Sequence, residues 1–464
     1  MKVLFIFPGS GGFELAPEVR ISTGAFLPPL GILYLSSMLE SLGHSVKVID
    51  YNAEEQSDTA LQSALRSADV VGMTIHSEPH ELKSSMELSH KIKKISPDIP
   101  FIIGGPHCLF FPEQALRDHQ ADICVRGEGE YIIGPLIDAL EGKRDLSSIP
   151  GLTYYQNGGI QSTSSNEQIK DLDALPFPSR HLVEKYDYGY FLGTKIIKGK
   201  VASLMTSRGC PGCCTFCQVS SYLPKYRVRS AKNSTQEIDE LIQKGYTSIA
   251  FVDDNFLGNK KAAEQIMDHI IQQNYDLRLW ILDTRVDSAD RRLYEKMRDA
   301  GVEHISFGIE SGNQDILDYY RKKITLEQVR KAVDLSKEMG FLVSGDFIIG
   351  APIETKEHIE KTIRFAKSLP LDNVAFSHLM YIARAPLWRQ AVEQGKINPD
   401  EFMVFSDKQR GLAQFDADEI EAYCMKAYRN FFFDPRYWFR EISYAVSHQD
   451  LTVLELGLRM LHLK

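Results

Sequence analysis

Short apolar runs alternate with amphipathic segments along the first 142 residues. The apolar runs have the length of buried strands, and the segments between them have the apolar spacing of helices. This alternation predicts a doubly wound α/β domain with a parallel sheet and crossover helices. Strands are expected at residues 2–8, 45–50, 69–74, 99–104 and 122–125, and helices at 30–42, 58–67, 79–95, 112–118 and 131–140.

A second alternation of the same kind spans residues 197–396. Strands are expected at 203–206, 248–252, 278–283, 304–307, 344–349 and 373–379, and helices at 234–244, 260–273, 289–300, 314–320, 326–339 and 356–368. Six β/α units predict a partial (β/α)6 barrel. In parallel barrels the functional residues lie at the carboxyl ends of the strands, so the loops after these strands are where chemistry is expected.

Two further segments complete the domain plan. Residues 143–196 have the Gly, Pro and Ser content of a linker, and a small hairpin is predicted across Gly158 and Gly159. Residues 397–464 predict a helical C-terminal domain with helices at 417–432, 435–447 and 451–462. Its aromatic and basic stretch 428–442 fits either a cap packed against the barrel or a lid over an apolar substrate.

The composition narrows the class of protein. The chain has 464 residues, too many for a single ordinary core, and a net charge of −9, which argues against a nucleic-acid partner. We see no run of 18 apolar residues and no leader before the first strand, so neither a transmembrane segment nor a signal peptide is expected. The seven cysteines, four of them clustered, favour a reducing cytoplasm over a disulfide framework.

The clustered cysteines follow the first strand of the second alternation, within residues 207–217. Cys210, Cys214 and Cys217 have the spacing C-x3-C-x2-C, whereas including Cys213 gives two fused C-x2-C pairs. Thiolates this dense hold a soft metal or an iron–sulfur cluster. The four-cysteine interpretation is a closed zinc site or an ordinary cluster.

The three-cysteine spacing, with the aromatic Phe216 before the last cysteine, resembles the radical S-adenosylmethionine (SAM) superfamily. The resemblance implies a [4Fe–4S] cluster held by Cys210, Cys214 and Cys217. One iron stays open to bind the amino and carboxylate groups of SAM, and cleavage of SAM then gives a 5′-deoxyadenosyl radical. An external electron donor such as flavodoxin or ferredoxin is implied as well.

The same resemblance assigns SAM-binding roles to residues at the later strand ends. It places a backbone contact to the SAM amino group at Asp253 and Asp254, and a bond to the ribose or amino group at Glu310. A carboxylate at such a place can instead cap a helix. The full expected set is Asp253, Asp254, Arg285, Glu310, Ile348 and Gly350.

Glycines and histidines gather at the expected strand ends of the first alternation. Each loop alone is ordinary turn chemistry. Together, the strings PPLGILYLSSMLE, IIGGPHCLFFPEQAL and RGEGE resemble the cobalamin-binding domain of B12-dependent radical SAM enzymes, a flavodoxin- or Rossmann-like domain. The helical tail at residues 397–464 resembles the one that follows the barrel in the branch of the hopanoid methylases and the anaerobic magnesium-protoporphyrin ester cyclase. The implied cobalamin-binding residues are Gly9, Ser10, Leu30, Thr74, His76, Gly104, Gly105, His107, Gly127, Glu128 and Gly129.

One departure from the pattern concerns cobalt. The chain has no D-x-H-x-x-G string, so His76 and His107 are not obvious cobalt ligands. The resemblance implies cobalamin bound with its own base detached and with no protein histidine on cobalt.

The function implied is methyl transfer to an unactivated carbon of a small molecule, through a deoxyadenosyl radical and methylcobalamin. Apolar molecules are among the candidate substrates. Ring rearrangement or oxidative cyclisation is the nearest alternative. A methylthiotransferase would need three N-terminal cysteines, and only Cys108 and Cys124 lie there. A cobalamin-binding sensor or carrier without turnover is the alternative from another class.

Overall fold

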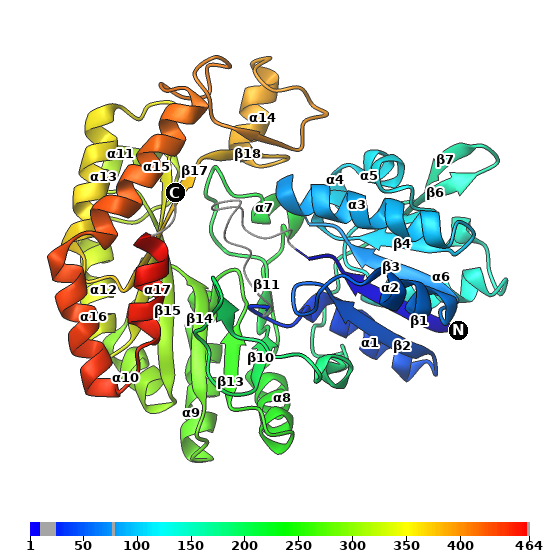
Figure 1. The fold of residues 1–464 in the computed structure, drawn as a ribbon, viewed down its shortest axis with the longest axis horizontal. Helices are drawn as coiled ribbons and strands as arrows, with labels where there is room; N and C mark the ends of the chain where they lie inside the picture. Colours follow the sequence, from blue (N-terminus) through cyan, green and yellow to red (C-terminus); the bar gives the residue numbers. More distant parts are fainter. Residues whose placement is uncertain (10–24, 77–78, 462–464) are drawn as a thin grey trace. The chain divides into compact units, whose positions relative to one another are not determined.

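The computed structural model describes residues 1–9, 25–76 and 79–461. The chain forms two compact units, Met1–Gly189 and Tyr190–Lys464. Each unit is built around a large sheet of its own, as Figure 1 shows. No helix among the described residues is long and apolar enough to cross a bilayer.

The first unit contains a seven-stranded sheet in the order β2-β1-β3-β4-β5-β6-β7. Strands β1 to β5 are parallel, which confirms the doubly wound fold. They are β1 Lys2–Phe7, β2 Ser45–Asp50, β3 Val70–Thr74, β4 Phe101–Gly104 and β5 Ile123–Val125. The helices are α1 Leu30–Ser41, α2 Asp58–Arg66, α3 Pro79–Ile95, α4 Pro106–Phe110, α5 Pro112–His119 and α6 Glu130–Leu140. Consecutive residues such as Phe5 and Ile6 are both buried, because helices cover both faces of the sheet.

The expected hairpin forms, but it belongs to the first sheet. Strand β6 (Leu152–Gln156) pairs antiparallel with β5, and β7 (Gly159–Ser162) pairs with β6. Leu152 and Tyr154 are buried by this pairing, which covers the edge of β5. The first unit therefore runs past the expected boundary at residue 142, and most of the segment expected as a linker is part of it.

Helix α4 has no counterpart among the predicted elements. It begins after Gly105, whose φ of 114° is in the region that favours glycine. A Cβ at Gly105 would lie 2.5 Å from the carbonyl oxygen of Ile75, so the loop after β4 passes directly against the loop after β3. The sequence pattern missed the helix because it has only five residues.

The second unit contains a six-stranded parallel sheet whose order, β10-β13-β14-β15-β16-β17, follows the chain. The strands are β10 Val201–Leu204, β13 Ser248–Phe251, β14 Arg278–Thr284, β15 Val302–Glu310, β16 Leu342–Ile349 and β17 Asn373–His378. The helices are α8 Ala231–Gln243, α9 Lys260–Gln272, α10 Arg291–Asp299, α11 Gln314–Tyr319, α12 Leu326–Glu338 and α13 Lys356–Ser368. This is the predicted partial (β/α)6 barrel, with β10 and β17 as its edges.

The two faces of the barrel strands differ in chemistry. Ile305 and Phe307 of β15 are fully buried on one face. The alternate residues are polar and bond from strand to strand: His304 Nε2 lies 2.8 Å from Ser344 Oγ, and Ser306 Oγ donates to Asp346 at 3.2 Å. Because helices cover the outer, apolar face, the polar face is the inside of the barrel.

The C-terminal segment packs on the barrel. It contains α14 Pro386–Glu393, α15 Ala417–Phe432, α16 Pro435–His448 and α17 Thr452–Leu461. Tyr428 accepts a 3.0 Å hydrogen bond from the backbone of Phe376 in β17, and the two rings meet edge to face. Phe432 is 1% exposed. Most of the aromatic stretch is therefore a packed cap, although Phe439 remains 77% exposed.

Candidate cofactor sites

Two consecutive aspartates after β13 hold the entry to the cysteine loop. Asp253 accepts hydrogen bonds from the backbone and hydroxyl of Thr206 and from the hydroxyl of Ser207, the last at 2.6 Å. Asp254 accepts a 3.0 Å bond from the backbone of Gly209. Asp253 is 1% exposed, and burial raises its pKa although these bonds oppose the rise. The Asp253 carboxylate therefore holds the start of the cysteine loop in place through these hydrogen bonds.

The four thiols of the cysteine loop differ in their exposure to solvent. Cys210, Cys214 and Cys217 are partly buried, whereas Cys213 is exposed. Backbone N–H groups donate to two of the sulfur atoms, Gly212 to Cys210 at 3.3 Å and Val219 to Cys217 at 3.4 Å. Such bonds are typical of sulfur atoms that hold iron–sulfur clusters. Burial raises the pKa of Cys217 to about 12, and the nearby Cys214 and Cys210 add to the rise.

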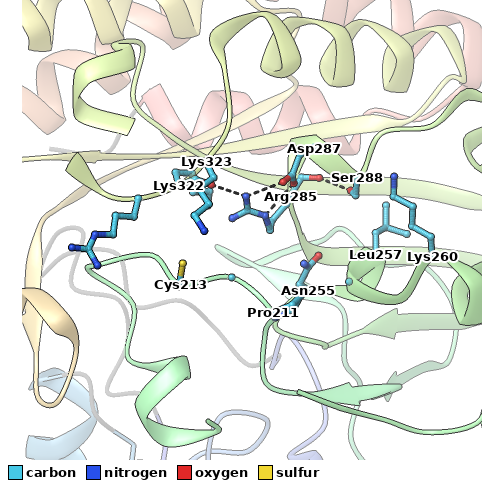
Figure 2. Close-up of a pocket in the computed structure, with 13 residues that line it drawn as sticks. Pro211, Cys213, Asn255, Leu257, Lys260, Arg285, Asp287, Ser288, Lys322 and Lys323 are labelled. Carbon is cyan, nitrogen blue, oxygen red and sulfur yellow. Dashed lines mark hydrogen bonds and ion pairs between the residues drawn. The ribbon is translucent and has the colours of Figure 1, made fainter. Parts of the chain in front are cut away.

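Arg285 lies between the cysteine loop and the loop after α11. Its Nη1 is 3.9 Å from the sulfur of Cys214, and its Nη2 donates to the carbonyl of Lys322 at 2.6 Å. Asp287 accepts from the same guanidinium at 2.9 and 3.0 Å. Figure 2 shows Arg285 with Asp287 and Lys322. A guanidinium at this distance favours the thiolate form of a neighbouring cysteine.

Glu310 ends β15 in a conformation that bulky side chains avoid, with φ of 67°. Its Oε1 lies 2.6 Å from Nζ of Lys322, and both side chains are 7% exposed. Burial alone would lower the pKa of Lys322, but the Glu310 carboxylate and Cys214 raise it. A Cβ at Gly308 would lie 2.6 Å from Glu310 Oε1, so a larger residue there would displace this pair.

The last two expected SAM residues lie at the end of β16. Ile348 is partly buried, and Gly350 has φ of 112°. The backbone N–H groups of Gly350 and Ala351 donate to Glu354, at 2.7 and 3.3 Å, and Glu354 is fully buried. The Glu354 carboxylate thus fixes the shape of this strand end.

Two carboxylates inside the barrel were not among the expected site residues. Asp283 is exposed to solvent, yet the protein that surrounds it raises its pKa to about 8, and the charge of Asp346 adds to this. Burial raises the pKa of Asp346 to about 7, with a contribution from Glu310. The alternation of Ser344 and Asp346 with apolar residues is the signal that could have identified Asp346 as an inward residue.

In the first unit, the expected cobalamin residues lie at the carboxyl edge of the parallel strands. Gly9 follows β1, Thr74 and His76 lie at the end of β3, and the remaining glycines follow β4 and β5. The order 2-1-3-4-5 reverses between β1 and β3, which is where doubly wound sheets bind ligands. Leu30 begins α1, and Ser10 lies outside the described residues.

The two histidines at this edge are neutral. The ring of His76 meets Phe7 of β1 edge to face at 5.2 Å, and its Nδ1 lies 3.9 Å from Glu81. Its buried Nε2 has no hydrogen-bond partner among the described residues. His107 is 3% exposed and stacks on Phe111. Burial lowers the pKa of each histidine to about 4. A neutral nitrogen at the switch point, with no partner among the described residues, fits a ligand bound there.

The loop after β5 is partly structural. Glu128 accepts a 2.7 Å bond from the backbone of Ile169, and its carbonyl accepts from Asn166 at 2.6 Å. Gly127, with φ of 91°, would meet none of the described residues within 4 Å if it carried a Cβ, so there is open space at this position. Glu128 therefore ties the returning segment 166–169 to the edge of the sheet.

Comparison with known proteins matches both units. The Radical SAM superfamily model matches residues 204–366, and the B12 binding domain model matches residues 19–136. An uncharacterized methyltransferase of Pyrococcus horikoshii is 32% identical over 449 residues, 95% of each chain. The anaerobic magnesium-protoporphyrin IX monomethyl ester cyclase of Rubrivivax gelatinosus is 30% identical over 79% of this chain and 66% of its own.

Solved structures share the fold. The radical SAM methyltransferase TsrM from Kitasatospora setae has a TM-score of 0.70 at 20% identity, over 85% of this chain and 76% of its own. The cobalamin-dependent radical SAM enzyme OxsB has a TM-score of 0.70 at 18% identity, over 98% of this chain and 72% of its own. The two family models, one matched in each unit, identify a radical SAM enzyme with a B12-binding domain. The chain belongs to the cobalamin-dependent radical SAM enzymes, and its cofactors are a [4Fe–4S] cluster, SAM and cobalamin.

Proposed function

We propose that this enzyme transfers a methyl group from SAM to an unactivated carbon of a small molecule. The observation that carries the proposal is the cysteine loop, in which Cys210, Cys214 and Cys217 are partly buried at the barrel mouth and Cys213 is exposed. Three ligands leave one iron of a cluster open for SAM. Similar proteins described as methyltransferases, among them the hopanoid C-3 methylase of Methylococcus capsulatus at 25% identity, support the choice of reaction.

The cofactors supply the radical and carry the methyl group, whereas the protein supplies position. Cys210, Cys214 and Cys217 would hold the cluster, and Asp253 and Asp254 would fix the loop that presents them. Glu310 and Lys322 together would offer one carboxylate and one ammonium group to SAM. The neutral His76 at the switch point and the glycines after β4 and β5 would line the cobalamin site.

The experiment uses SAM labelled in its methyl group, with extracts or compound mixtures as the source of substrate. The label should appear in a product, with 5′-deoxyadenosine and S-adenosylhomocysteine formed in comparable amounts. Cys213→Ala should retain this chemistry and Cys214→Ala should abolish it. Deoxyadenosine formed with an unlabelled, rearranged or cyclised product would contradict methyl transfer.

That outcome would favour the second candidate, ring rearrangement or oxidative cyclisation. Its support is the identity of 30% with a cyclase. A protein that binds cobalamin but never cleaves SAM would instead be a sensor or carrier.

A further inference from the structure

A cavity of about 330 Å³ opens on one side of the cysteine loop (Figure 2). Cys213 lines this cavity, and Cys210, Cys214 and Cys217 do not. The Gly212–Cys213 backbone is therefore a wall, with the three proposed cluster ligands behind it and the cavity in front.

The cavity is strongly positive. Five cationic side chains line it against one carboxylate, Asp287, which already pairs with Arg285. Lys260, Arg321 and Lys323 are exposed, and no carboxylate of the described residues forms an ion pair with any of them. A net charge of −9 on the whole chain makes this local excess of positive charge a distinct feature.

Two residues that line the cavity contact the sulfur atoms of proposed cluster ligands. Gly212 donates to the sulfur of Cys210 at 3.3 Å. Arg285, which also lines the cavity, reaches within 3.9 Å of the sulfur of Cys214. An electron arriving at the cavity would therefore meet two residues that directly contact the proposed ligands.

We infer that Lys260, Arg321 and Lys323, around the exposed Cys213, form the docking surface for an acidic one-electron carrier protein of the flavodoxin or ferredoxin class. The inference rests on the proposed function, because only a redox-active cluster needs such a partner. One electron would pass from the reduced carrier to the oxidised cluster, and no bond would form or break. Charge complementarity of this kind speeds association and weakens with salt.

The test compares two triple variants with the same change of charge. The first is Lys260→Glu, Arg321→Glu and Lys323→Glu. The control is Lys331→Glu, Lys356→Glu and Lys361→Glu, which reverses three exposed lysines on helices α12 and α13. Each protein is reconstituted with iron and sulfide and mixed with reduced flavodoxin or with dithionite, and cluster reduction is followed by electron paramagnetic resonance.

We expect the first variant to be reduced by flavodoxin at least tenfold more slowly than the native enzyme. The control should change less than twofold, and dithionite should reduce all three proteins alike. The native rate with flavodoxin should also fall as salt is raised. Binding of oxidised flavodoxin to the unreconstituted protein, measured by calorimetry, should weaken in the same variant.

Equal flavodoxin rates in both variants would overturn the inference, and so would tight binding of inorganic phosphate in the cavity without any effect on those rates. A missing cluster signal with dithionite in the native protein would instead refute the proposed function. The two failures are therefore distinguishable.

Discussion

Glu310 and Lys322 form an ion pair of 2.6 Å at the mouth of the barrel, and both side chains are buried. The pair joins the end of β15 to the loop after α11, twelve residues further along the chain. Burial makes each partner depend on the other, because removing one leaves an uncompensated charge in the protein interior.

We expect Glu310→Ala to weaken SAM binding without loss of the cluster, and to lower the free energy of unfolding by about 3–5 kcal/mol. Calorimetric SAM titration, iron analysis and urea unfolding measure these three effects. The matched control is Glu310→Ala with Lys322→Met, which removes both charges. It should recover stability but not SAM affinity. Recovery of SAM affinity in the double variant would show that Glu310 only neutralises Lys322.

The cysteine loop gives the second prediction. Single changes of Cys210, Cys214 or Cys217 to Ala should abolish the [4Fe–4S] signal, because three ligands are the minimum that holds the cube. Cys213→Ala should keep about four irons per chain, since this thiol lies in the outer cavity. Iron content and electron paramagnetic resonance are the measurements. Equal loss of iron in Cys213→Ala and Cys210→Ala would favour four-thiolate coordination.

The third prediction concerns pH. The pKa of Asp346 rises to about 7 in the folded protein, so the folded state binds this proton more tightly than the unfolded chain does. Stability due to Asp346 is therefore complete below about pH 4 and is lost as the pH rises to 7. Ser306 donates to this carboxylate, and Glu310 and Lys322 contribute charge around it. The charge of Asp346 in turn raises the pKa of the neighbouring Asp283.

Asp346→Asn mimics the protonated form, so its stability relative to the native protein should increase between pH 5 and pH 8. Urea unfolding at both values measures the difference. Asp334→Asn, which changes an exposed carboxylate on α12, should show no such dependence. Parallel pH curves for the native protein and Asp346→Asn would contradict the assignment.

The fourth prediction concerns cobalamin. We expect a base-off visible spectrum in the native protein, retained in His76→Ala and His107→Ala, because the chain lacks D-x-H-x-x-G. The Nε2 of His76 has no partner in the part of the chain that the structure describes, which makes that residue the sharper test. Nitrogen superhyperfine coupling from the protein in the cobalt(II) spectrum, lost in His76→Ala, would identify His76 as a cobalt ligand and refute the expectation.

The sequence by itself determined both parallel sheets and the position of the cysteine loop. The period and the length of an apolar run depend only on nearby residues. Every strand of the doubly wound domain and of the barrel therefore overlaps its expected segment. The spacing of Cys210, Cys214 and Cys217 is equally local. Strand ends also follow from the pattern, which is why Arg285 and Glu310 were expected at the barrel mouth.

Only the tertiary structure decided how these side chains are used. Asp253 and Glu128 are bonded within the protein to segments distant in sequence, and no periodicity encodes such partners. The pairing of Glu310 with Lys322 and the positive cavity around Cys213 arise where separate loops converge. The hairpin β6–β7 joined the first sheet for the same reason: an edge strand takes whichever partner the fold brings alongside it.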